Sequence, residues 1–157
     1  TDQSTGLVWQ RTKSLTIMPW AESVEYCQSN TPGLPGSGWH LPNVSEFRTL
    51  VRGCSNTETD GLCGLVDVCQ ACGTTASCLG DPCQVNSECE CAKGGGPTGG
   101  CYGPPELDSP CARYWTSSEY PSSSNSYSWG IGFDDAGLGF NSKANNEKWI
   151  RCVRSGP

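Results

Sequence analysis

Residues 38–51 read GWHLPNVSEFRTLV, a turn-forming start followed by a short amphipathic run. Asn43 precedes Glu46 by three positions, which is the spacing of a capping box that opens a helix. The apolar side chains that follow share one helix face and are Val44, Phe47, Leu50 and Val51. We therefore expect a helix that begins after Asn43 and stops at Gly53.

The sequence upstream of this segment predicts one strand and one helix. Residues 6–11 (GLVWQR) are a short apolar run with a polar end, which is typical of a strand. Pro19 suits the first position of a helix, and Trp20, Val24 and Cys27 follow at spacings of four and three. These three residues share one helix face, so we expect Cys27 to point into the core.

Downstream, four segments are expected to be strands: residues 113–118, 127–133, 138–141 and 149–154. In residues 127–133 large apolar side chains alternate with Ser and Gly, the period of a strand with one buried face. We accordingly interpret Trp129 as a core residue. Residues 134–137 (DDAG) predict a turn, and Ile150 and Cys152 share a face of the last strand.

Cysteine divides the chain into two parts. Ten of the 12 cysteines lie within residues 54–111, a segment with eight acidic residues and one basic residue, whereas the rest has eight acidic and nine basic residues. This density is typical of disulfides formed in an oxidising compartment. Zinc is the alternative, but Cys69 and Cys72 form the only CxxC pair. We expect one domain over residues 1–157, with an acidic cysteine-rich insert at 54–111 that holds little regular structure.

Several separated motifs together resemble a known family: TGLVWQR (5–11), GWHLPNVSEFRTLV (38–51), YWTSSEY (114–120), SWGIGF (128–133) and WIRCVRSG (149–156). Apart from the insert, residues 3 to 156 resemble the bacterial DUF1566 family, which is related to the C-terminal domain of the Legionella collagen-like adhesin. The resemblance implies an α+β, C-type-lectin-like fold, with two helices around a small curved antiparallel sheet and a long irregular loop region. It also implies a disulfide from the first helix to the last strand, which Cys27 and Cys152 match in position.

The resemblance and the disulfides together predict an extracellular or cell-surface bacterial module for binding or adhesion. Its expected partner is a glycan or a surface protein, although the Glu-Pro-Asn and Gln-Pro-Asp motifs of calcium-dependent lectins are absent. The predicted contact residues lie in the late loops and are Tyr120, Ser124, Asn125, Asp135, Asn141 and Asn145. Rings beside short polar side chains make adaptable contact surfaces. Residues 119–128 and 134–148 connect antiparallel strands, so we expect their tips to meet at one end of the sheet.

Two groups of polar residues could carry further chemistry. Oxygen ligands for calcium could come from Asp134, Asp135, Asn141, Asn145, Asn146 and Glu147, although a simple turn explains the two aspartates equally well. No other cofactor is expected. His40 is the only histidine, and no nearby motif supplies the nucleophile or carboxylate that a general base needs. We interpret it as a structural or surface residue.

Charge and hydropathy exclude several partners. A net charge of −6 disfavours nucleic acid and sulfated polysaccharides, and no apolar run approaches the ~18 residues of a membrane span. We expect no enzyme activity, because the sequence offers no catalytic set. The alternatives are a disulfide-stapled structural subunit of a surface appendage, or an enzyme related to the formylglycine-generating enzymes. The chain is expected to belong to a larger surface protein or assembly.

Overall fold

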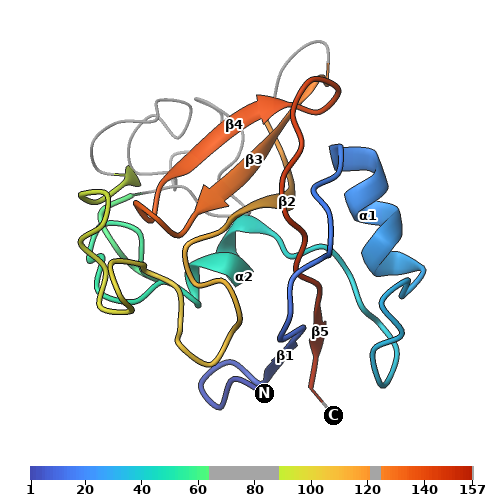
Figure 1. Cartoon of the computed structure of the whole chain (residues 1–157), viewed down its shortest axis with the longest axis horizontal. Helices are drawn as coiled ribbons and strands as arrows, with labels where there is room; N and C mark the ends of the chain where they lie inside the picture. The colour runs from blue at the N-terminus through green and yellow to red at the C-terminus, as the bar shows by residue number, and fades with distance from the viewer. Residues whose placement is uncertain (64–88, 121–124, 157) are drawn as a thin grey trace.

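The computed structural model describes residues 1–63, 89–120 and 125–156. Its elements are β1 (Leu7–Trp9), α1 (Trp20–Gln28), α2 (Val44–Arg48), β2 (Arg113–Glu119), β3 (Tyr127–Gly132), β4 (Leu138–Ser142) and β5 (Val153–Ser155) (Figure 1). Strands β2, β3 and β4 form one antiparallel sheet in that order, and β1 pairs antiparallel with β5. The predicted α+β class, with two helices and small antiparallel sheets, is confirmed.

The three-stranded sheet separates two hydrophobic clusters. Tyr114 and Trp115 are consecutive on β2, so their side chains point to opposite faces. Tyr114 packs into the larger cluster, together with Phe47 of α2, whereas Trp115 packs with Cys27 of α1 in the smaller one. The Trp115 indole also donates to the Met18 carbonyl at 3.0 Å, which fixes the start of α1 against β2. Each helix thus covers its own face of the sheet.

The capping box predicted for α2 is present, but the helix is shorter than expected. The Asn43 side chain accepts the Glu46 N–H at 2.8 Å, and the Glu46 carboxylate accepts the Asn43 N–H at 2.8 Å. The helix ends at Arg48 rather than near Gly53. Leu50 and Val51 instead donate to carbonyls three residues back, and such tighter turns commonly finish a helix.

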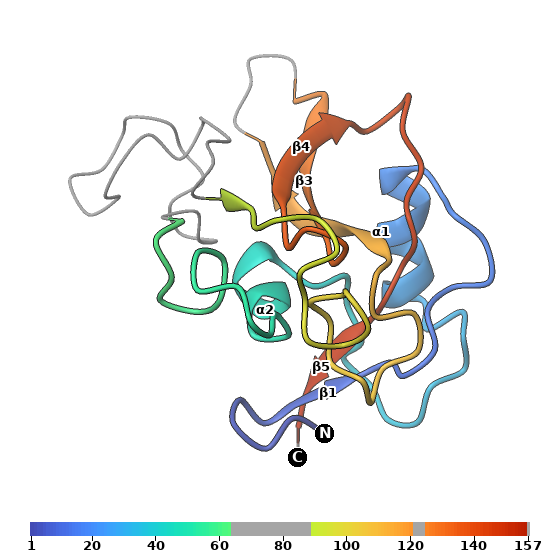
Figure 2. The same ribbon diagram turned by 60° about the vertical axis from the view of Figure 1, so that its left-hand side comes forward.

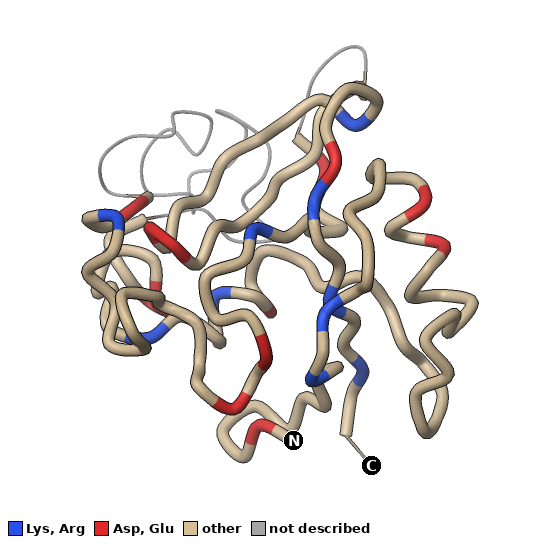
Figure 3. The backbone as a smooth tube through the Cα atoms, in the orientation of Figure 1, with Lys and Arg blue, Asp and Glu red and all other residues tan. Residues whose placement is uncertain are grey.

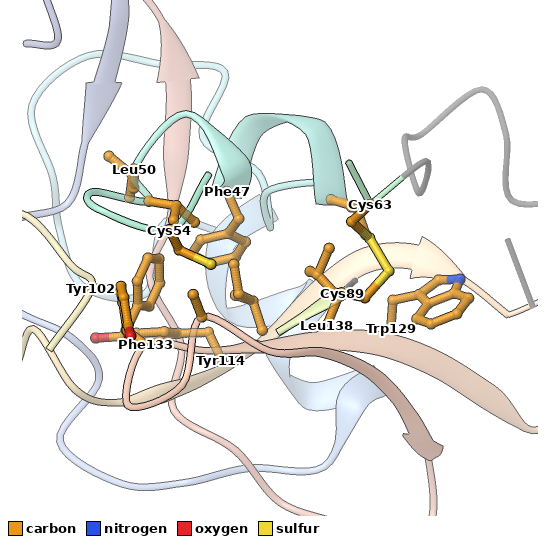
Figure 4. Packing of buried hydrophobic residues seen from close by; sticks show 14 of the residues in the cluster. Phe47, Leu50, Cys54, Cys63, Cys89, Tyr102, Tyr114, Trp129, Phe133 and Leu138 are labelled. Atoms are coloured by element: carbon orange, nitrogen blue, oxygen red, sulfur yellow. A yellow bond between two sulfur atoms is a disulfide. The ribbon is translucent and has the colours of Figure 1, made fainter. Parts of the chain in front are cut away.

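The larger cluster contains residues from both ends of the insert (Figure 4). The Phe47 ring lies 5.6 Å from Tyr114 and 6.2 Å from Phe133, measured between ring centroids. The described part of the insert contributes four buried residues to this cluster, namely Cys54, Cys63, Cys89 and Tyr102. Trp129 is 1% exposed, as predicted for a core residue. The ends of the insert therefore form part of the core.

Within residues 54–63 and 89–111 the structure has turns and isolated bridges but neither α-helix nor strand, in agreement with the expected irregular insert. Three disulfides connect these two stretches or close a loop within them: Cys54–Cys91, Cys63–Cys89 and Cys101–Cys111. The fourth is Cys27–Cys152, the pairing implied by the resemblance. Cys69, Cys72, Cys78 and Cys83 lie outside the described residues.

The last predicted strand, 149–154, is regular only from Val153 onward. The segment before it bonds to several partners in turn: Trp149 donates to the Arg113 carbonyl, Ile150 to the Ser14 hydroxyl and Cys152 to the Gln10 side chain. The segment therefore leaves the three-stranded sheet and crosses to β1. Because its hydrogen-bond partners change along the way, it does not form a continuous β-ladder with any one strand. Through the β1–β5 pairing the two termini lie side by side in both views (Figures 1 and 2).

One buried arginine joins the segments that meet at this crossing. Arg151 is 2% exposed. One of its terminal nitrogens donates to the Gln10 carbonyl at 2.6 Å and to the Arg11 carbonyl. The other donates to the Asp108 carbonyl at 2.5 Å and to the Tyr114 hydroxyl at 2.9 Å. A single guanidinium thus connects the chain after β1, the end of the insert and β2.

Several cations lie over aromatic rings. The basic residues from the end of β4 to β5 are Lys143, Lys148, Arg151 and Arg154 (Figure 3), and they lie over Trp20, Trp115, Tyr114 and Trp39, respectively. Such contacts contribute about 0.5–1 kcal/mol each at exposed sites and more when desolvated. Basic side chains of this segment are therefore used in packing. No helix among the described residues has the length and apolar character needed to cross a membrane.

Candidate functional site

Four of the predicted contact residues lie toward one end of the three-stranded sheet. Tyr120 follows β2, Asn125 precedes β3, Asn141 lies on β4 and Asn145 follows it. Because Tyr127 of β3 pairs with Ser142 of β4, the β2–β3 connection and the chain after β4 meet here. We call the surface formed by Tyr120, Asn125, Tyr127, Lys143 and Asn145 the loop-end surface.

Lys143 holds this surface together. Its ammonium group contacts the Glu119 carboxylate, the Asn125 carbonyl at 3.1 Å and the Asn125 side-chain oxygen at 3.3 Å. Its backbone N–H donates to the Ser126 carbonyl at 2.9 Å, and the ammonium lies 4.2 Å from the centre of the Trp20 ring. Asn125 has a positive φ of 50°, a conformation that Asn tolerates better than most residues. Lys143 therefore fixes the end of the β2–β3 connection against β4 and α1.

Aromatic rings support the same surface from the core side. Tyr120 stacks on Phe140 with centroids 4.0 Å apart, and its ring edge meets Trp129 at 5.4 Å. Tyr127 packs edge-on against Phe140 at 5.8 Å yet is 38% exposed. Tyr120 is only half-buried, whereas Asn125 and Asn145 are exposed. An exposed ring thus lies on a packed aromatic base, at the same end of the sheet as the exposed Asn125 and Asn145.

Two of the predicted contact residues, Asp135 and Asn141, are not part of this surface. Asp135 lies in the β3–β4 turn, at the opposite end of the sheet, so the expectation that all late loops meet at one end is wrong. Consecutive turns of an antiparallel meander lie at alternate ends, and only the first and third can meet. Asn141 lies near the loop-end surface, but its side chain points to the other face from Phe140. Ser124 is outside the described residues.

Cations neutralise the two turn aspartates. Arg113 donates to Asp134 at 3.0 Å and to Asp135 at 2.5 Å, and Lys93 lies 3.2 Å from Asp134. Burial alone would raise the pKa of Asp134, but hydrogen bonds from Arg113 and Lys93 bring it below its ordinary value. An Asp135 oxygen also accepts the Gly137 N–H at 2.8 Å, which stabilises the turn.

These contacts argue against the six-residue calcium cluster. Asp134 and Asp135 lie in the β3–β4 turn with two cations, while Asn145, Asn146 and Glu147 follow the far end of β4. Five residues of strand, at about 3.3 Å each, separate the groups. Within residues 1–63, 89–120 and 125–156 no three acidic, histidine or cysteine side chains are arranged to hold a metal ion.

His40 has a carboxylate partner that the sequence argument missed. Its Nε2 lies 3.0 Å from Glu46 Oε1, and its Nδ1 lies 3.1 Å from the Gly38 carbonyl. The other Glu46 oxygen accepts the Asn43 N–H, so one carboxylate serves both the histidine and the helix cap. The contact with Glu46 raises the pKa of His40, although partial burial opposes the shift.

The His40–Glu46 pair predicts a small pH dependence of stability. Because the folded-state pKa is raised above the unfolded value, the added stability is fully present below about pH 6.5 and is lost as the pH rises through the folded-state pKa. The His40 side chain is 40% exposed, so screening limits the effect to about 0.5 kcal/mol. Thermal unfolding of the wild type and His40→Gln at pH 5.5 and 8.5 measures it. Equal pH responses of the two proteins would contradict this assignment.

The fold, its disulfides and the loop-end surface define a disulfide-stapled α+β domain with an exposed polar and aromatic surface. The chain belongs to the Lcl C-terminal domain family, whose sequence model matches residues 1–154. This match spans the insert as well as the flanking elements. Comparisons with curated proteins and with solved structures gave no significant match. Family membership and the four disulfides of the described residues indicate a domain of a bacterial surface protein.

Proposed function

We propose that the chain is an extracellular, non-enzymatic binding module that recognises a glycan or a protein through its loop-end surface. The observation that carries the proposal is the exposed Tyr127 ring, held on a packed aromatic base at the end of the sheet where Asn125 and Asn145 are also exposed. Tyrosine supplies contact area at low entropic cost, and neighbouring Asn side chains supply hydrogen bonds. The Lys143 contacts support it further, because a surface fixed before binding loses less entropy on binding.

We also propose a C-type-lectin-like arrangement for the fold. The features that support it are the pairing of the terminal strands, one helix on each face of the central sheet and the Cys27–Cys152 disulfide between α1 and the chain before β5. In this arrangement the loop-end surface lies away from the paired termini (Figure 1). A ligand bound there would therefore lie away from both ends of the chain.

The first test is a screen of glycans and cell-surface proteins, with and without calcium, followed by variants of the loop-end surface. Tyr127→Ala should weaken binding about tenfold, since removal of an aromatic anchor costs more than about 1 kcal/mol. Asn145→Ala should weaken it by a similar factor, because a hydrogen bond to the ligand contributes about 1 kcal/mol. Leu15→Ala is the matched control, because Leu15 is 91% exposed and outside this surface. Unchanged binding by both variants, with loss in Lys93→Ala at the insert, would move the site to the insert.

A structural subunit of a surface appendage is the second candidate. The observation that favours it is the exposed apolar pair Leu15 and Ile17, at 91% and 45% exposure. Sedimentation of the purified domain distinguishes the two functions. Self-association that is lost in a Leu15→Ser, Ile17→Ser double variant, together with no hit in the ligand screen, would favour the structural subunit.

A further inference from the structure

A cavity of about 450 Å³ lies near the paired termini, away from the loop-end surface. Four separate parts of the chain form its walls: the N-terminal turn, β1 and the residues that directly follow it, the chain after α2, and the end of the insert. The lining residues that could contact a ligand through apolar or charged side chains are Trp9, Arg11, Leu50, Arg52, Glu106 and Leu107. The volume falls within the range of about 300–1,000 Å³ typical of small-molecule sites.

The apolar part of the lining contains a buried donor without an acceptor. Trp9 is 9% exposed and lines the cavity beside Leu50 and Leu107. Its indole Nε1 is buried and has no hydrogen-bond partner. That nitrogen is closed off from solvent, so it is not within reach of a ligand in the cavity. What Trp9 offers to a ligand, with Leu50 and Leu107, is an apolar wall.

Two guanidinium groups on the lining have donors to spare. Arg52 uses Nη1 for the Thr49 carbonyl at 2.5 Å and the Val51 carbonyl at 2.9 Å. Its Nε and Nη2 meet no protein acceptor in the described part of the chain. Arg11 is 79% exposed and has only a long contact, 3.9 Å from its Nε to Asp108. A carboxylate is the group that matches such paired N–H donors best.

Of the two acids on the lining, one is already occupied. Asp2 accepts the Ser4 N–H at 2.9 Å and the Ser4 and Thr5 hydroxyls at 2.7 and 2.9 Å. Glu106 is exposed, and no donor among the described residues binds its carboxylate. Asp2 also interacts electrostatically with Arg52, but the Nε and Nη2 of Arg52 donate no hydrogen bond to it. The lining thus offers open guanidinium donors together with one carboxylate that has no donor among the described residues, a combination suited to a ligand that carries both charges.

The walls are fixed by contacts outside the cavity. The Arg52 N–H donates to the Tyr102 carbonyl at 2.8 Å, which joins the chain after α2 to the insert. The Cys101–Cys111 disulfide closes the loop that holds Glu106, and Arg151 holds its Asp108 carbonyl. These contacts fix the backbone of the walls before a ligand arrives, while the Arg11 and Glu106 side chains stay exposed and accessible to it.

We propose that this cavity binds a small zwitterion with an apolar side chain, a free α-amino acid or a short peptide with free ends. The carboxylate contacts Arg52 and Arg11, the ammonium contacts Glu106, and the apolar side chain covers Trp9, Leu50 and Leu107. No covalent step is involved. The cavity shares no residue with the loop-end surface, so a negative result for this proposal does not affect the proposed function.

The test is titration of the whole chain with L-phenylalanine and with L-leucyl-L-phenylalanine, followed by calorimetry and by the indole N–H signals of an ¹H–¹⁵N spectrum. The chain has six tryptophans, and the signal lost in Trp9→Phe assigns Trp9. We expect that signal to shift on binding. N-acetyl-L-phenylalanine and L-phenylalaninamide, which each lack one charge, should bind about tenfold more weakly. The relative affinities of the two parent probes show which source of the zwitterion is preferred.

Two variants test the charges, each with a matched control. Arg52→Gln and Glu106→Gln should each weaken binding of the preferred probe about tenfold, whereas Arg154→Gln and Glu147→Gln, outside the cavity, should leave it unchanged. Unchanged melting temperatures establish that the variants are folded. The proposal is overturned if neither probe binds up to its solubility limit, if the capped analogues bind equally well, or if the Trp9 signal does not move.

Discussion

Removal of the Cys27–Cys152 disulfide is expected to lower the free energy of unfolding by about 5 kcal/mol. The bridge joins residues 125 positions apart, and in the chain-entropy model a longer closed loop restricts the unfolded chain more strongly. Both cysteines are fully buried in the smaller cluster, so alanine in their place also leaves some packing unfilled. Chemical denaturation of Cys27→Ala, Cys152→Ala against the wild type measures the loss.

The Cys101–Cys111 disulfide provides the matched control for this prediction. It spans only ten positions, so the same model gives about 3 kcal/mol for its removal. We expect the double alanine variant at Cys27 and Cys152 to be the less stable of the two. Equal losses would show that loop closure is not the main contribution of these bridges.

Replacement of Arg151 by methionine should destabilise the fold by about 3 kcal/mol. Methionine keeps much of the apolar volume but leaves the carbonyls of Gln10, Arg11 and Asp108 without their charged donor. Hydrogen bonds to charged groups contribute roughly 1.5–3 kcal/mol each, and removal of the buried charge offsets part of the total. Denaturant unfolding of Arg151→Met measures the change.

Two further variants show whether the geometry of Arg151 is responsible. Arg151→Lys keeps the charge but cannot serve four acceptors from one planar group, so we expect most of the loss to remain. Arg154→Met removes a neighbouring arginine that lies over the Trp39 ring and should cost less than about 1 kcal/mol. A stable Arg151→Met protein would refute the role of this residue in joining the three segments.

The sequence predicts best those features that depend on neighbouring residues. The capping box is predictable from Asn43 and Glu46 alone, which lie three positions apart. The burial of Trp129 is predictable from the alternation of large and small residues along its own strand. The end of α2 was less predictable, because residues after Arg48 keep a helical apolar pattern while adopting tighter turns. Leu50 and Val51 are buried there although the regular helix has already ended.

The candidate site depends more on contacts between distant segments. Lys143 meets Asn125, 18 positions away, and Arg113 meets Asp135, 22 positions away, so no local pattern reveals either pair. The position of Asp135 was nevertheless open to prediction, because alternate turns of a meander lie at opposite ends. The partner of His40 was missed because six positions separate it from Glu46, and a turn brings them together.

The pairing of β1 with β5 has a mechanical consequence. Because the two ends of the chain leave side by side, a force that pulls them apart loads the hydrogen bonds of this ladder one after another, as in a zip. On the C-terminal side the opening stops at Cys152, next to β5, and on the N-terminal side it stops at Cys27, after the chain that follows β1 and most of α1 have been drawn out. From then on the covalent bridge carries the load between these two residues. The chain between the two cysteines, which includes the central sheet and the loop-end surface, is bypassed by the tension and keeps its shape while the ends are stretched.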